Sequence, residues 1–119
     1  MINRVVLVGR LATDSVLRYS RDGLAISAFS VAVGRTESGT EFLPVVVFRR
    51  LAEATSRYLC KGRLVGIEGR LATRTFDTTD GEQRRIIEIV ADRLRFLDPP
   101  IALGEETPKP GTPEPASQG

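Results

Sequence analysis

Two arginines and a phenylalanine recur at alternate positions in the segment 63–76, whose alternation is typical of a β-strand. Successive strand residues face opposite sides. One side carries Arg70, Arg74 and Phe76. The other side is apolar, at Val65, Ile67 and Leu71, and we expect it to face the core. Guanidinium groups bind phosphates and aromatic rings stack on unpaired bases, so the first side suits a single-stranded polyanion. The alternative is a solvated strand face on which Phe76 covers a barrel end.

A hairpin holds this strand against the next one. Asp80-Gly81 ends a turn that needs the positive φ of glycine, and the segment Glu82–Leu97 again reads as a strand. Further strands are expected at Ile2–Leu11, Leu24–Val33 and Glu41–Arg50, with a short strand or extended link at Ser15–Ser20 and a polar loop at Gly34–Thr40. In Glu41–Arg50, Phe42 and Phe48 share one side with Arg50, and Arg49 lies on the other.

Leu51–Leu59 is the one segment with helical spacing, and Cys60-Lys61-Gly62 ends it. The order is therefore three main strands, one helix and two strands. That order predicts an all-β fold, the five-stranded Greek-key barrel called the OB-fold, with its helix between strands 3 and 4. We expect this domain to occupy residues 1–98. Six of the seven prolines lie in 99–119, so we expect a disordered Pro-rich tail there.

The charge distribution favours an anionic partner for the predicted barrel. Residues 1–97 hold 16 basic and 11 acidic side chains, a net charge of +5, whereas residues 98–119 have a net charge of −3. The chain has no histidine and one cysteine, so we expect no metal site, no cofactor and no disulfide. Its scattered carboxylates form no catalytic pair, so we expect no enzyme activity. Without an apolar signal or membrane-spanning run, we expect a cytoplasmic, nucleoid-associated protein.

Four blocks of sequence occur in an order that is found in a known family. They are Met1–Leu11 (MINRVVLVGRL), Leu17–Ser20 (LRYS), Leu51–Gly62 (LAEATSRYLCKG) and Ile67–Arg74 (IEGRLATR). Together they resemble the bacterial single-stranded DNA-binding protein family. The resemblance implies a homotetramer that binds single-stranded DNA without sequence preference and protects it in DNA replication, recombination and repair. By motif, it implies that bases stack on Phe42, Phe48 and Phe76.

The basic side chains then become candidates for phosphate contact. They are Arg4, Arg10, Arg35, Arg49, Arg70, Arg74, Arg84 and Arg85. Three features depart from the family pattern. No tryptophan is present, the loop Gly34–Thr40 is short, and the tail lacks the acidic, apolar tip that recruits partner proteins, which puts such recruitment in doubt.

Two other functions stay open at this point. Val6 and Val8 on the outer side of the first strand favour a dimer, although they could instead be barrel core. A dimeric accessory protein of primosome, phage or plasmid type, acting mainly through protein contacts, is therefore the alternative function. RNA is also open as a ligand, because stacking and phosphate contact do not distinguish the two sugars.

Overall fold

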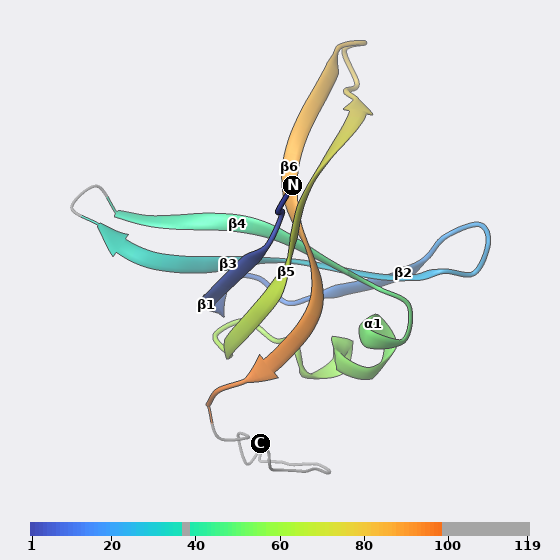
Figure 1. The fold of residues 1–119 in the computed structure, drawn as a ribbon. Coiled ribbons are helices and arrows are strands. Elements are labelled where there is room, and N and C mark those ends of the chain that lie inside the picture. The colour runs from blue at the N-terminus through green and yellow to red at the C-terminus, as the bar shows by residue number, and fades with distance from the viewer. Residues whose placement is uncertain (37–38, 99–119) are drawn as a thin grey trace.

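The structure is a computed structural model that describes residues 1–36 and 39–98, with the backbone alone at residues 35 and 36. A strongly bent sheet closes on itself, and one short helix lies beside it (Figure 1). In chain order the elements are β1 (Val5–Leu11), β2 (Val16–Tyr19), β3 (Ala25–Thr36), β4 (Gly39–Phe48), α1 (Arg49–Thr55), a 3₁₀ turn (Ser56–Tyr58), β5 (Leu64–Asp77) and β6 (Gln83–Phe96).

The strand order is β1-β5-β6-β4-β3-β2, and an additional pairing of β1 with β3 closes the barrel. All neighbours are antiparallel except β4 and β6, which run parallel. Closure brings two backbones together at Gly9, where a Cβ would lie 2.4 Å from the Ala32 carbonyl oxygen. Only glycine fits so close an approach. The closed sheet with one helix between β4 and β5 confirms the predicted barrel, and Ser15–Ser20 contributes β2 as a sixth strand.

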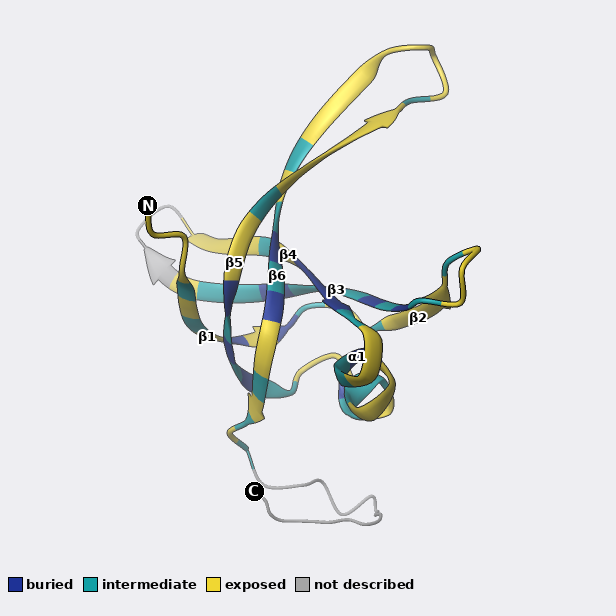
Figure 2. Cartoon of the chain, turned by 45° about the vertical axis from the view of Figure 1, so that its right-hand side comes forward, coloured by how far each residue is buried: buried dark blue, intermediate teal, exposed yellow. Residues whose placement is uncertain are grey.

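The core is built from alternate strand residues. Figure 2 shows buried segments where the strands cross, and exposed ones along the projecting hairpins. The buried side chains that face the core from the strands are Leu11, Ala25, Ser27, Phe29, Val31, Val45, Val47, Val65, Ile67, Ile89 and Ala91, whereas Val46 is buried on the opposite side of β4. Ala52 from α1 and Leu59 after the 3₁₀ turn complete the core. Burial of these side chains stabilises the barrel at roughly 25 cal/mol per Å² of apolar surface.

A bulge in β6 changes which residues face the core. Glu68 pairs with Arg93 but Gly69 pairs with Ala91, so Asp92 is the extra residue. Ile89 and Ala91 face inward before the bulge, while Leu94 and Phe96 pair with the inward-facing Ile67 and Val65 after it. An extra residue reverses the alternation of a strand, so one strand uses both parities in a single core.

Several sequence expectations need correction. Glu41–Arg50 is not all strand, because β4 ends at Phe48 and Arg49 begins α1 with φ +64°. The expected loop Gly34–Thr40 is shorter, since β3 runs to Thr36 and β4 resumes at Gly39. Leu71 is not core but 47% exposed, because the β5–β6 hairpin leaves the barrel there. The predicted tail, 99–119, lies outside the described residues.

Candidate nucleic-acid interface

Among the hairpins that project from the barrel are β3–β4 and β5–β6 (Figure 1). We call the second one, from Arg70 to Val90, the arm. On the outer side, Ala32 is opposite Phe42, Ile26 is opposite Phe48, and Val46 of β4 neighbours Val90 of β6. Paired residues point to the same side of a sheet. The outer side of β4 therefore continues onto the arm.

This continuous surface is the aromatic face. Its members are Val16 and Arg18 of β2, Ile26, Ala28, Ser30 and Ala32 of β3, Phe42, Pro44, Val46 and Phe48 of β4, Arg70, Ala72, Arg74 and Phe76 of β5, and Arg84, Ile86, Glu88 and Val90 of β6.

The three phenylalanines expected to stack on bases all lie on this face. Phe42 is 64% exposed and Phe76 is 39% exposed, whereas Phe48 is half-buried. Phe29, by contrast, is in the core. Packing in the core is therefore not the role of Phe42 or Phe76. Three rings from two hairpins on one side of the sheet can each offer a surface to an unpaired base.

The tip of the arm is a hydrogen-bonded turn. The Thr78 amide donates to the Glu82 carbonyl at 2.7 Å, and Gly81 adopts the expected positive φ, +87°. The Thr78 hydroxyl donates to the Asp80 carboxylate, and this bond lowers the pKa of the Asp80 carboxyl. At the base of the arm, the Asn3 side chain bonds both the N–H and the C=O of Leu71 at 2.9 Å. Hydrogen bonds therefore order the turn at the tip of the arm and tie its base to Asn3.

Four predicted arginines lie on the arm, and they fall into three groups. Arg70 and Arg84 lie exposed on the aromatic face, Arg84 directly opposite Phe76. Arg74 is on the same face, but its Nε lies 3.4 Å from a Glu88 oxygen and its guanidinium carbon lies 5.8 Å from the Phe76 ring centre. Arg85 is opposite Thr75, on the other side of the arm. The structure therefore does not bring Arg85 to the aromatic face.

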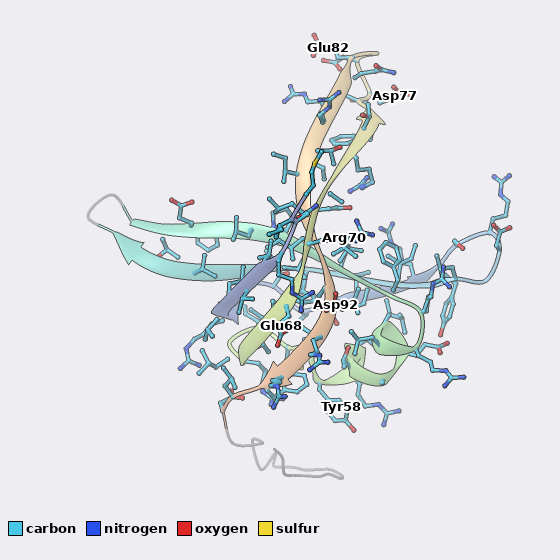
Figure 3. All side chains as sticks on the ribbon, in the orientation of Figure 1. Tyr58, Glu68, Arg70, Asp77, Glu82 and Asp92 are labelled. Atoms are coloured by element: carbon cyan, nitrogen blue, oxygen red, sulfur yellow. The ribbon has the colours of Figure 1, made fainter. Side chains whose placement is uncertain are left out.

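The remaining predicted arginines are less available to a ligand on this face. The Arg4 guanidinium pairs with Glu68 at 2.7 Å and Asp92 at 3.1 Å, and these carboxylates raise its pKa. Figure 3 shows Glu68 and Asp92 below Arg70, near the middle of the barrel. Arg10 donates to the Gly62 carbonyl at 3.0 Å. Arg49 is exposed at the start of α1, and the Arg35 side chain is not described.

Two residues of the face were missed by the sequence reasoning. Arg18 is opposite Ile26, which is in turn opposite Phe48, so a basic side chain lies in the same cross-strand row as the half-buried ring, two strands away. The alternation of Val16 and Arg18 with Leu17 and Tyr19 was a signal that could have found it. Glu88 brings a carboxylate to the face, and its position followed only from its pairing with Ala72.

A second outer surface lies on β1, β5 and the end of β6. Val6 is 71% exposed and Val8 is 54% exposed, so they are not barrel core. They line a shallow depression together with Gly66, Glu68, Arg93, Arg95 and Leu97, and we call this the valine face. In the described part of the chain, β3 pairs with β1 only at Arg10 and Leu11, so one edge of Val5–Val8 has no paired strand.

Other kinds of site find little support among the described residues. Histidine, cysteine and acidic side chains of residues 1–36 and 39–98 form no group of three that could hold a metal ion. Within the same ranges, every helix is too short or too polar to cross a membrane.

Comparison with known proteins agrees with this geometry. The model of the single-strand binding protein family matches residues 2–97. A single-stranded DNA-binding protein of Caldanaerobacter subterraneus subsp. tengcongensis is 43% identical over 110 residues, which cover 87% of this chain and 73% of the relative. Single-stranded DNA-binding protein 2 of Staphylococcus aureus strain COL is 44% identical over 105 residues, which cover 83% and 76%.

These findings confirm the resemblance carried by the four sequence blocks. The family is one of binding proteins rather than enzymes, as the lack of a catalytic motif predicted. The match runs from β1 to the end of β6 and includes both hairpins of the aromatic face. The chain belongs to the single-strand binding protein family.

Proposed function

We propose that this chain binds single-stranded DNA without sequence preference, with bases stacked on Phe42, Phe48 and Phe76. The observation that carries the proposal is the gathering of these rings on one outer side of the sheet. Each stacked base contributes roughly 1–3 kcal/mol, and stacking accepts any base because every base has a π-face.

Arginines around the rings supply the phosphate contacts in this proposal. Arg70 and Arg84 are exposed beside Phe76, and Arg18 lies in the cross-strand row of Phe48. Each phosphate that an arginine neutralises releases a counterion, so the affinity falls as salt rises. Arg10, Arg35 and Arg49 stay candidates at the margins, whereas the ion pairs of Arg4 argue against it.

A titration with labelled oligo-dT of several lengths, at two salt concentrations, tests the proposal. The label must be on the DNA, because the chain has no tryptophan to report binding. We expect tight binding at low salt that weakens as salt rises, and weaker binding to duplex of the same length. Binding that is independent of salt, or equally tight to duplex, would refute the proposal. Oligo-U of matched length tests whether the sugar matters.

Protection of single strands in replication, recombination and repair is the cellular role that we propose for this binding. An assembly of several subunits would cover more of a strand, and the valine face supports such an assembly. Two exposed valines and an unpaired edge of β1 can join a second copy of the chain by strand addition and apolar packing. We propose a homotetramer, with a dimer as the smaller unit.

The valine face also favours a second candidate function. A dimeric accessory of primosome, phage or plasmid type would keep this contact and act mainly through proteins. Native mass spectrometry combined with the titration separates the two functions. A tetramer with salt-dependent binding of oligo-dT supports the first function, and a dimer with weak binding supports the second.

A further inference from the structure

The aromatic face carries one acidic side chain among its described members, Glu88. A carboxylate on a surface that receives phosphates is unfavourable by itself, because like charges repel. Glu88 is nevertheless on the arm itself, near its base, opposite Ala72 and two residue pairs away from Arg70 and Val90. Its side chain is only 12% exposed. This position therefore calls for an explanation in terms of what it does to its neighbours.

The neighbour that reaches Glu88 is Arg74. Directly opposite Arg74 is Ile86, so Glu88 is its diagonal neighbour, within reach of a long side chain. The small Ala72 leaves the space that the guanidinium needs. Arg74 Nε and Nη2 lie 3.4 and 3.5 Å from the two carboxylate oxygens, and its guanidinium carbon lies 5.8 Å from the Phe76 ring centre. Arg74 thus interacts with a carboxylate and an aromatic ring within its own arm.

Arg70 and Arg84 differ in this respect. Both are exposed on the same arm and the same face, yet within the described residues neither has an ion pair. A phosphate meeting Arg70 or Arg84 displaces a mobile counterion into bulk solvent. A phosphate meeting Arg74 must compete with Glu88, whose low exposure weakens solvent screening of the pair. Displacing Glu88 also leaves a carboxylate beside the bound strand.

We propose that Glu88 is an affinity-limiting positioning residue: it neutralises Arg74 and keeps it beside Phe76, so that the arm binds phosphates through Arg70 and Arg84 but not through Arg74. The proposal rests on the proposed binding of single-stranded DNA to this face. It predicts that removing the negative charge tightens binding, whereas a residue with only a structural role would weaken binding when changed.

Four variants test this: Glu88→Gln, Arg74→Gln, the double variant, and Arg70→Gln as the matched control on the same strand and face. The measurement is the affinity for labelled oligo-dT between 50 and 200 mM salt, which gives the slope of log affinity against log salt. One phosphate contact changes that slope by about 0.7 for a single strand. Circular dichroism melts check that each variant is folded.

We expect Glu88→Gln to bind about two- to fivefold tighter at 50 mM salt. Its slope should steepen by about 0.7, which makes the loss of affinity over this range about 2.6-fold larger than in the wild type. Arg70→Gln should flatten the slope by a similar amount. Arg74→Gln should bind more weakly than Arg70→Gln, because it leaves Glu88 unpaired. The double variant should recover a slope and affinity close to those of the wild type.

Unchanged or weaker binding by folded Glu88→Gln overturns the proposal, as does a double variant no better than Arg74→Gln. These outcomes are distinct from failure of the proposed function. If the wild type itself does not bind oligo-dT, the function is wrong. If the wild type binds with the expected salt dependence and Glu88→Gln does not bind tighter, the function stands and the role of Glu88 is wrong.

Discussion

Phe76→Ala is expected to weaken binding of single-stranded DNA more than Phe48→Ala. Phe76 lies near the tip of the arm with 39% of its surface exposed, so a base can stack on the ring with little rearrangement. Phe48 is half-buried, so less of its ring is free to stack. A full stack contributes roughly 1–3 kcal/mol, which is about a 5- to 150-fold change in affinity. We expect Phe76→Ala to fall in that range and Phe48→Ala to lose less than about fivefold.

Tyr19→Ala is the matched control for this comparison. Tyr19 is an exposed aromatic residue, but it is opposite Ala25, whose side chain faces the core side of the sheet. Its hydroxyl also bonds Glu53 of α1 at 3.4 Å. Its removal should leave the affinity for oligo-dT within about twofold of the wild type. The assay is again the titration with labelled oligo-dT at fixed salt.

A tryptophan at position 76 gives an independent measurement. Because the chain has no tryptophan, Phe76→Trp introduces a single fluorophore, and stacking on a base should quench its fluorescence. Tyr19→Trp should show no such quenching. Equal losses for Phe76→Ala and Phe48→Ala, or the reverse order, would refute the ranking. Quenching at position 19 but not at 76 would refute the assignment of the aromatic face itself.

Three further predictions concern the backbone, the assembly and the turn. Arg49→Gly should raise the melting temperature by about 2–8 °C, because the left-handed backbone at position 49 costs an L-residue about 1–2 kcal/mol. The larger conformational entropy that glycine loses on folding offsets part of this gain. Arg49→Ala, which keeps φ +64°, should not raise the melting temperature. Val8→Glu should lower the native mass of the assembly, because it places a charge on the valine face. Thr73→Glu, on the arm, should leave the native mass unchanged. An unchanged native mass for Val8→Glu would exclude the valine face from the assembly. Thr78→Val should raise the pKa of Asp80 toward its ordinary value, as measured by NMR titration. Because folding lowers that pKa, the stabilising effect of the Thr78–Asp80 bond is present at neutral pH and is lost as the pH falls through the folded-state pKa, and an unchanged Asp80 titration in Thr78→Val would contradict the assigned cause.

The alternation of residues predicted much of the aromatic face. It grouped Phe42 with Phe48 in one segment, and Arg70 with Arg74 and Phe76 in another, as the structure has them. What it could not show is that the two groups share one surface. That depends on the parallel pairing of Val46 with Val90, two residues far apart in sequence. Parity within a strand is local information, whereas the joining of strands is not.

The errors have the same origin. Leu71 has the parity of Val65 and Ile67, but parity does not tell where a hairpin leaves the barrel and loses its covering layer. Arg4 was a candidate for phosphate contact because it is basic, and its ion pairs had no signal in the sequence. Its partners, Glu68 and Asp92, come from two other strands, and Asp92 is available only because it is the bulged residue. The left-handed Arg49 had no signal, since arginine does not favour positive φ.

The bulge at Asp92 lies where the aromatic face and the valine face meet on the same strands. Val90, on the tip side of the bulge, belongs to the aromatic face, and Arg93 and Arg95, on the other side, belong to the valine face. At this boundary Arg4 forms ion pairs with both Glu68 and Asp92. These ion pairs link the start of β1 to β5 and β6. Single-stranded DNA bound on the aromatic face and a subunit packed on the valine face would therefore both contact β5 and β6. Because Glu68 lines the valine face and Phe76 lies near the tip of the arm, changes that loosen the Arg4 ion pairs should affect assembly before they affect stacking on Phe76.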